Sequence, residues 1–361
     1  MTAQLAHRST NDGHGRLHLS RRLAAVSAVG VVALLAAACG GETGDTTAGS
    51  SDVPVVYGVF ATPLEEPWDG AIHAALTAAD KDGDIDYKHT DNNDSADKMS
   101  RTLRDLVANA KPDIIFGDAF AAEDAVREVA ADSTSTDFVF GSGEKPVGQN
   151  FSVFDNWLQD PAYLAGMLAG GMTKSDTIGV VAALPIPEVN RIVNAFTAGV
   201  KETNPQATVK VTFINSFFDP TTAKQAALAQ VSQGADVLFA ERAGVIEAAE
   251  EKDLPVIGMM VDQESEAPQN VVTSLVWDMR PTIDHVVEAF NAGTLESADL
   301  GEFSFMKNNG SSLAQINTDV PGGVSQELVD QVEAKQADIM DGSFTTPVDE
   351  GAPAGSTSVG E

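Results

Sequence analysis

The stretch PDIIFGD at residues 112–118 returns as ADVLFAE at residues 235–241, and an alanine-rich segment follows each copy. Two further pairs of segments occur in the same order: DFVFG (137–141) with LPVIG (254–258), and GVF (58–60) with GVV (179–181). The offset between the copies stays between 117 and 123 residues. Three apolar runs that return in register predict a chain of two similar lobes, with chance convergence of short runs as the alternative.

Each lobe is predicted to alternate short strands with helices. Short apolar runs indicate parallel strands that are covered on both faces, and such runs occur at residues 55–60, 114–117, 138–141, 178–182, 209–214, 237–240, 256–259 and 271–276. Residues 99–107 carry one apolar helical stripe. Asp219 and Pro220 have the pattern of an N-cap and a first helical residue, and Pro67 and Pro187 are predicted to begin helices. This alternation predicts an α/β fold with two doubly wound parallel-sheet lobes.

The two ends of the chain differ in composition from the lobes. Residues 40–53 are mainly Gly, Ser, Thr and acid, which is typical of a flexible tether, and the C-terminal end has the same character. The predicted parts are a signal peptide (1–38), a tether (39–53), an N-terminal lobe (54–150, with a return segment at about 278–300), a C-terminal lobe (151–277), a C-terminal strand and helix that complete the lobes (301–344) and a disordered tail (345–361). We expect a hinge of crossing segments between the lobes.

Cys39 is the only cysteine of the chain, and it follows a short apolar run. Two arginines precede the uncharged residues 23–38, which lead into AAACGG at residues 36–41. A run of this length behind a basic region is typical of a secretory signal rather than of a membrane-spanning helix. The pattern resembles a bacterial lipoprotein signal, although Ala36 stands where leucine is preferred. We expect export and a lipid anchor on Cys39 at the outer face of the cytoplasmic membrane, with a plain secretory signal as the alternative.

The chain is strongly acidic. Residues 1–38 carry four arginines and one aspartate, so the net charge of −31 becomes −34 without them. Such a surface repels nucleic acid and anionic lipid, and we exclude both as partners. Only His73, His89 and His285 follow residue 38, and the sequence has no zinc, thiol, P-loop or serine-hydrolase motif. We therefore expect a monomer that is not an enzyme and that uses no metal or cofactor.

Candidate ligand-binding residues follow the strands, because ligands of open parallel sheets bind outside the carboxyl ends of the strands. Two facing lobes would bring those ends to one cleft. The residues there are rich in aromatic rings and carboxylates and poor in bases, and the candidates are Phe60, Trp68, Asp118, Trp157, Phe217, Phe218, Glu241, Asp262 and Trp277. Rings stack on planar ligands, whereas an anion would need an arginine clamp or a nest of N–H groups. The set favours a neutral or cationic planar molecule, or a sugar.

Each candidate also has a structural interpretation. The three phenylalanines can belong to the core at the ends of strands. Trp68 can pack at the start of a helix, and Trp157 can pack at a crossover between the lobes. Asp118, Glu241 and Asp262 can be solvated loop acids in so acidic a chain. Both interpretations stay open at the level of the sequence.

Residues 150–290 resemble the basic-membrane-protein family of ABC-transporter substrate-binding lipoproteins. The resemblance is carried, in order, by YLAG (163–166), TK (173–174), IGV (178–180), PIPEVNR (185–191), NAFTAG (194–199), FFDP (217–220), QGADV (233–237) and VIEAA (245–249). Residues 54–150 match the family more loosely. The resemblance implies a type I periplasmic-binding fold that closes on a purine nucleoside or a free base and docks on an ABC permease in the membrane.

The same resemblance narrows the expected ligand. Phe217 falls on the aromatic residue before the family's Asp-Pro, and Asp262 falls on the carboxylate after the Val-Ile-Gly strand. Many nucleoside-binding members have an aspartate at the position of Met260, whereas FFDP and the Val-Trp pair at 276–277 look more like the base-binding branch. We therefore expect the ligand to be a purine base, with a nucleoside as the next candidate. The alternatives are a sugar-binding protein, a sensor for a membrane kinase, and a secreted nucleoside-hydrolysing enzyme that uses Asp118 or Asp262.

Overall fold

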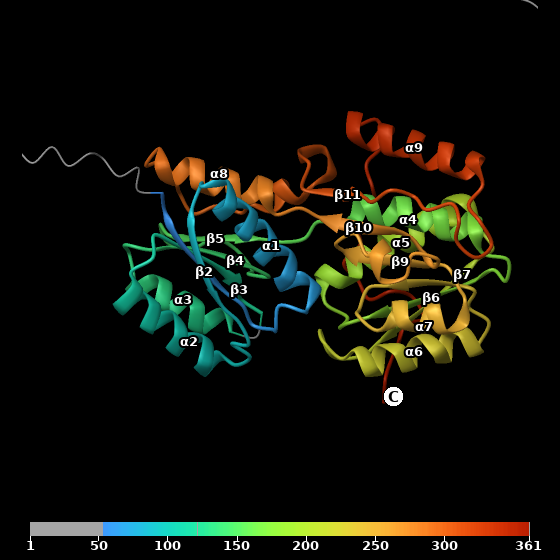
Figure 1. The fold of residues 1–361 in the computed structure, drawn as a ribbon, viewed down its shortest axis with the longest axis horizontal. Helices are drawn as coiled ribbons and strands as arrows, with labels where there is room; N and C mark the ends of the chain where they lie inside the picture. Colours follow the sequence, from blue (N-terminus) through green and yellow to red (C-terminus); the bar gives the residue numbers. More distant parts are fainter. Residues whose placement is uncertain (1–52, 121, 361) are drawn as a thin grey trace, which may run out of the picture. The chain divides into compact units, whose positions relative to one another are not determined.

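A computed structural model of the protein describes residues 53–120 and 122–360. The predicted signal peptide, Cys39 and most of the tether lie outside this part of the chain. The described residues form two α/β lobes, each with its own sheet (Figure 1). The chain passes between the lobes after β5 (Phe151–Phe154), after β10 (Val271–Trp277) and after α8 (Arg280–Asn291). Two doubly wound sheets confirm the predicted fold class.

The first lobe is built on a five-stranded parallel sheet in the order β2-β1-β3-β4-β5. Its other elements are β1 (Val55–Val59), β2 (Asp86–Thr90), β3 (Ile114–Asp118), β4 (Asp137–Gly141), α1 (Pro67–Asp82), α2 (Ala96–Asp105), a π-helix (Leu106–Ala110) and α3 (Glu123–Asp132). Successive side chains of β3 enter opposite cores. Ile114 and Phe116 lie in the core that contains α1, whereas Ile115 lies in the core with α2 and α3. Helix α8 packs against α1.

The second lobe is built on a seven-stranded sheet in the order β11-β10-β9-β8-β6-β7-β12, in which only the β10–β11 pair is antiparallel. Its other elements are β6 (Thr177–Ala182), β7 (Thr208–Phe213), β8 (Val237–Ala240), β9 (Val256–Met260), β11 (Ser311–Leu313), β12 (Thr357–Ser358), α4 (Gln159–Met172), α5 (Pro187–Thr203), α6 (Pro220–Ser232), α7 (Val245–Lys252), α9 (Gln326–Asp341) and the short 3-10 helices Glu264–Glu266, Gly301–Ser304 and Met306–Asn308. Within β8, Val237 and Phe239 lie in the core with α4 and α5, whereas Leu238 lies in the core with α6 and α7. None of the helices in the described ranges has the length and apolarity that a membrane span requires.

Helices α4 and α5 approach one another more closely than side chains would allow. A Cβ atom on Gly166 would lie 2.0 Å from the carbonyl oxygen of Phe196, and one on Gly199 would lie 1.9 Å from that of Tyr163. Glycine is therefore required at both positions, and any larger residue would push the helices apart. This contact fixes the direction of α5, whose first turns carry polar side chains to the gap between the lobes.

Helix starts follow the predicted signals. Proline stands in the first turn of α1, α5 and α6, and Asp219 caps α6 by accepting from the N–H of Thr222 at 3.0 Å. The aspartate satisfies an N–H group that has no partner within the helix, and proline has no N–H to lose there. The prolines after β1, β6 and β7 thus turn the chain into helices close to the strand ends.

Two sequence-based boundaries need correction. Strand β5 pairs in parallel with β4, so residues 151–154 belong to the first lobe and the crossover follows residue 154 rather than residue 150. Residues 345–360 were predicted to be disordered, but they run along the second lobe and end in β12, where Thr357 pairs with Thr212 of β7. Hydrogen bonds to backbone groups hold the tail in place, so it is ordered although its sequence has no apolar periodicity.

Candidate ligand-binding site between the lobes

A cavity lies where the carboxyl ends of the two sheets face one another. Its walls come from the ends of β1 and β3 and from the start of α1 in the first lobe, and from the loops and helix starts after β6, β7 and β8 in the second. The lining residues are Ala61, Thr62, Glu66, Trp68, Asp118, Phe120, Ser142, Glu188, Phe217 and Arg242. The cavity has a volume of about 50 Å³. This is the position at which parallel sheets bind their ligands.

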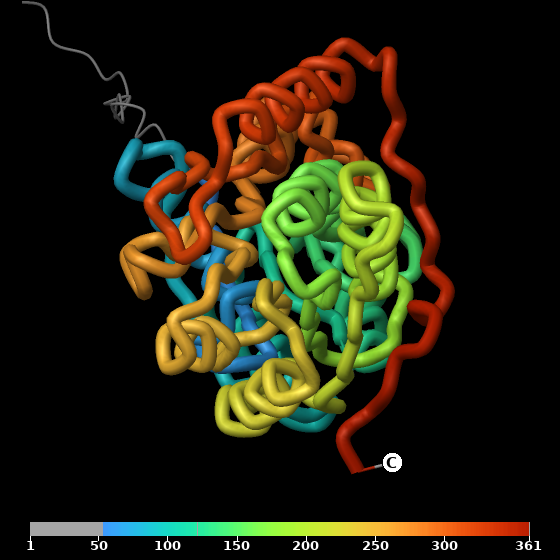
Figure 2. Tube along the Cα trace, turned by 90° about the vertical axis from the view of Figure 1, so that its right-hand side faces the viewer, coloured from blue at the N-terminus to red at the C-terminus, as the bar shows by residue number. Residues whose placement is uncertain are grey.

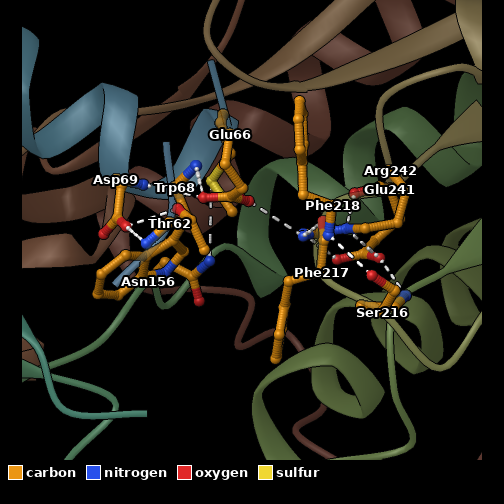
Figure 3. Close-up of polar contacts among 12 residues, drawn as sticks. Thr62, Glu66, Trp68, Asp69, Asn156, Ser216, Phe217, Phe218, Glu241 and Arg242 are labelled. Carbon is orange, nitrogen blue, oxygen red and sulfur yellow. Dashed lines mark hydrogen bonds and ion pairs between the residues drawn. The ribbon is translucent and has the colours of Figure 1, made fainter. Parts of the chain in front are cut away.

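Arg242 connects the two lobes inside the cavity. Its Nη1 lies 3.1 Å from Oε1 of Glu66 in the first lobe, and its Nη2 donates to Oε1 of Glu241 at 2.8 Å (Figure 3). Nη1 also donates to the backbone carbonyl of Phe217 at 3.1 Å. All three charged side chains are almost completely buried. The guanidinium is therefore already paired, and it is not available to clamp an anionic ligand.

Glu66 also caps α1. Its Oε2 accepts from the backbone N–H groups of Trp68 at 2.9 Å and Asp69 at 3.0 Å, while its Oε1 faces Arg242. A carboxylate is favourable at this position because the first N–H groups of a helix lack partners and carry partial positive charge. The same side chain thus fixes the start of α1, which carries Trp68, and the contact between the lobes.

Three further carboxyl groups are buried at the cavity. Burial and the neighbouring Glu66 raise the pKa of Asp69 to about 7. Burial and the nearby Asp155 raise the pKa of Glu188 to about 8, although two arginines act in the opposite direction. Burial, with Asp69 nearby, also raises the pKa of Asp118 well above its usual value. The raised pKa values favour the protonated form of these carboxyl groups in the cavity, and donor groups of a ligand can replace those protons.

Aromatic rings from both lobes meet at the cavity. Phe120 of the first lobe and Phe217 of the second contact edge to face, with ring centroids 4.6 Å apart. Trp68 lines the same cavity and stacks on Phe154, with centroids 5.8 Å apart and an angle of 11° between the rings. The Nε1 of Trp68 is buried without a hydrogen-bond partner among the described residues. A flat ligand that separates Phe120 from Phe217 would therefore contact a ring from each lobe.

The structure brings some of the nine predicted site residues together. Trp68, Asp118 and Phe217 line the cavity. Glu241 lies in its wall through its ion pair with the cavity arginine, and it also accepts from the N–H of Ala183 at the end of β6. Trp157 lines a second cavity that adjoins the first.

The other four predicted residues do not line the cavity. Phe60 is fully buried in the core of the first lobe, and Trp277 is buried against Trp68 with ring centroids 5.1 Å apart. Phe218 is 36% exposed, and Asp262 is exposed and caps a short turn after β9. A place at the end of a strand does not determine where a side chain points, because successive side chains of a strand point to opposite faces.

The second cavity shares Phe120, Ser142 and Glu188 with the first and extends it toward the crossover after β5. Arg191 forms part of its wall, and its guanidinium lies 4.1 Å from the ring centroid of Trp157. The side chain of Arg191 is 2% exposed, and its Nε has no hydrogen-bond partner among the residues that the structure describes. We call the two spaces the inner cavity and the outer cavity.

The nine predicted site residues do not include Glu66 and Arg242, which join the two lobes, or Glu188, which lines both cavities. A signal existed for Glu66, because a carboxylate directly before Pro67 has the pattern of an N-cap. Arg242 directly follows a predicted strand, so its place beside the cleft could also be expected. Glu188 lies in the first turn of α5, one residue after the proline that opens the helix. Its direction depends on the packing of α5 on α4, which no local pattern shows.

Two facing α/β lobes with a cavity at their strand ends have the fold of the type I periplasmic-binding class. An ABC transporter system solute-binding protein from Conexibacter woesei DSM 14684 has the same fold, with a TM-score of 0.67 and 21% sequence identity. The match covers 82% of this chain and 99% of that one. At this identity the likeness establishes the fold.

Sequence comparison places the chain in a family. Residues 60–345 match the model of the Bmp family, described as ABC transporter substrate-binding protein PnrA-like. A Haloferax volcanii protein named for glucose binding by an ABC transporter is 32% identical over 276 residues, which are 76% of this chain and 68% of that protein. A purine-binding protein of Brucella abortus is 28% identical over 244 residues, which are 67% of this chain and 68% of that protein. The chain belongs to the Bmp family, as its resemblance predicted.

Membership of this family sets the kind of function. The family model describes substrate-binding proteins of ABC transporters, which are binding proteins rather than enzymes. Such a protein binds a small molecule and works with an ABC permease in the membrane. The substrate-binding proteins of ABC importers are exported from the cytoplasm. Outside the cytoplasm they bind the ligand before the permease does.

Proposed function

We propose that this protein captures a purine base or a nucleoside in the inner cavity. The observation that carries the proposal is the meeting of one aromatic ring from each lobe, Phe120 and Phe217, beside buried carboxyl groups. A purine is flat and carries N–H groups, and many purines carry an exocyclic amine, so its faces suit the rings and its edge suits the carboxyl groups of Asp118 and Glu188. The Brucella relative is named for purine binding, which supports the same ligand class.

The proposed contacts can supply a useful affinity. A micromolar dissociation constant corresponds to about 8 kcal/mol. Two rings that stack on the ligand contribute about 2–6 kcal/mol at 1–3 kcal/mol each. Hydrogen bonds to the buried carboxyl groups would supply the remainder. In the closed conformation Phe120 and Phe217 touch, so a ligand of this size enters only after the lobes have turned apart as hinged bodies.

A sugar is the second candidate. The relative with 32% identity is named for glucose binding. Sugars bind to aromatic rings through their C–H faces, and carboxylates accept hydrogen bonds from their hydroxyl groups, so the same cavity would suit a sugar. The two candidates differ in one requirement: a purine is expected to stack on an aromatic ring at each of its two faces, whereas a sugar does not need both rings.

Calorimetry with adenine, adenosine and glucose distinguishes the two candidates. We expect adenine or adenosine to bind with micromolar affinity, and we expect Phe217→Ala to weaken that binding by about 10–100-fold because one stacked ring is lost. Phe218→Ala is the matched control, since the neighbouring ring lies outside the cavity and should leave the affinity unchanged. Binding of glucose alone would replace the purine by a sugar, and equal affinity in Phe217→Ala would place the ligand elsewhere.

We also propose that a lipid on Cys39 holds the protein at the outer face of the cytoplasmic membrane. The support is the lipoprotein-like pattern before this cysteine, since thioether attachment of the lipid needs a thiol. Cys39→Ser is expected to move the protein from the membrane fraction into the medium and to abolish labelling by a radioactive fatty acid. Continued labelling of the Cys39→Ser protein would contradict the anchor.

A further inference from the structure

We propose that the C-terminal strap, residues 347–360, is a positioning element of the ligand site, with Glu350 as its main positioning residue. The expected effect of the strap on ligand affinity rests on the proposed function, whereas the contacts of the strap with the second lobe do not depend on it. The strap lies just beyond the region that matches the family model, which ends at residue 345. Figure 2 shows the strap as the red tube that descends beside the green and yellow-green helices to the C-terminus.

The first anchor of the strap is the start of α5. Asn194 donates through Nδ2 to the carbonyls of Asp349 and Gly351 at 2.9 and 2.8 Å, and Asn190 donates through Nδ2 to the carbonyl of Glu350 at 3.0 Å. The two asparagines are four residues apart and therefore share one face of the helix. Three consecutive carbonyls of the strap are thus held by one helix.

This anchor brings the side chain of Glu350 to the outer cavity, where its Oε1 lies 3.3 Å from Nη1 of Arg191. Nη2 of Arg191 lies 2.6 Å from Oδ2 of Asp155, which stands in the crossover after β5. The guanidinium is buried and has two carboxylate partners, so the loss of either partner changes the balance of a buried charge. Glu350 thereby fixes the guanidinium between the crossover and the strap.

The second anchor is β12, which pairs in parallel with the end of β7. Val359 donates its N–H to the carbonyl of Phe213 at 2.9 Å, and Phe213 is the last residue of β7. The loop that follows carries Phe217 into the inner cavity. Without β12, β7 would be an open edge of the sheet, where backbone groups lack partners. The strap therefore also supports the loop that carries a ligand-facing ring.

The strap is held by polar contacts rather than by a core. Among residues 347–360 only Pro353 is buried. A segment with so little apolar burial can leave the surface without unfolding the lobe beneath it. One anchor of the strap holds Arg191 in the wall of the outer cavity, and the other supports the loop that carries Phe217 into the inner cavity. The strap therefore positions one wall of each cavity, although it contributes little to the core.

Hydrogen exchange in the ligand-free full chain tests these contacts. In Glu350→Ala we expect the amides of residues 187–194 to exchange about threefold faster, because Nη1 of Arg191 loses the side-chain oxygen that accepts its hydrogen bond at 3.3 Å. In a chain that ends at Thr346 we expect the amides of residues 213–219 to exchange about tenfold faster, because their loop opens more often. Glu350→Gln keeps the length and an oxygen acceptor, so its exchange should be close to wild type. Glu333→Ala, an exposed glutamate of α9, is the matched control.

Affinity for adenosine is the second readout, and we expect it to be about tenfold weaker in the shortened chain, as the loop that carries a stacked ring becomes mobile. Unchanged exchange at residues 187–194 and 213–219 would overturn the positioning role, whatever the ligand does. Should the shortened chain fail to fold, the exchange rates of residues 187–194 in Glu350→Ala and Glu350→Gln decide whether Glu350 has the positioning role. Should the wild-type protein bind neither adenine, adenosine nor glucose, the proposed function fails while the exchange rates still decide the role of the strap.

Discussion

Replacing Arg242 by methionine is expected to lower the free energy of unfolding by about 3–5 kcal/mol at pH 7. The substitution keeps much of the aliphatic volume, but it leaves Glu66 and Glu241 buried without the guanidinium that lies 3.1 and 2.8 Å from their carboxylates. Burial raises the pKa of both carboxyl groups even with the arginine present, so an ionised carboxylate without it is costly. Urea unfolding followed by tryptophan fluorescence measures the difference.

The loss of unfolding free energy in Arg242→Met is expected to become smaller as the pH falls toward 4. Without the arginine the folded-state pKa of both carboxyl groups rises further, and a carboxyl group with a raised folded-state pKa stabilises the fold at low pH relative to high pH. Arg104→Met is the matched control, because this arginine is 45% exposed and pairs with exposed acids. Its loss should cost less than about 1 kcal/mol. Equal losses in the two variants would show that Arg242 does not hold buried charges.

The fold was largely predictable from the sequence because most strands are buried on both faces. Strands such as β3, β4 and β8 read as continuous apolar runs, and prolines mark the starts of several helices. Strand β2 was missed because it is an edge strand with the sequence DYKHT, whose side chains are mostly exposed. Strands β11 and β12 are only three and two residues long, and their pairing depends on neighbours distant in sequence. Local pattern carries little information about such strands.

The site was only partly predictable, for a different physical reason. Asp118 ends β3 and Phe217 lies in the loop after β7, and both face the cleft, as the position of strand ends predicts. The pairing of Glu66 with Arg242 spans 176 residues and depends on how the lobes face one another. Trp277 ends a strand as well, but its ring packs against Trp68 rather than lining the cavity. Sequence thus identifies which segments reach the cleft, whereas packing decides which side chains face it.

The free energy of unfolding is expected to fall as the pH rises from about 5 to 8, and Glu188 is expected to cause much of the fall. Burial and the nearby Asp155 raise the pKa of Glu188 from its usual 4.5 to about 8. Between these pH values the folded state keeps a proton that the unfolded state has lost. The stability therefore declines by up to about 1.4 kcal/mol per pH unit, and the decline ends above the folded-state pKa.

Glu188→Gln is expected to remove about 1 kcal/mol per pH unit from this slope, because a neutral amide carries no titrating proton. Chemical unfolding at several pH values between 5 and 8 measures both slopes, and Glu128→Gln, at a side chain that is 70% exposed, should leave the slope of the wild type unchanged. Asp69, with a pKa of about 7, would keep part of the slope in Glu188→Gln. Equal slopes in the wild type and Glu188→Gln would mean that water reaches Glu188 and that it stays ionised. A flatter slope in Glu188→Gln than in the wild type would mean that Glu188 is protonated when the lobes are closed without ligand. A ligand with N–H or O–H donors would then displace that proton when it binds.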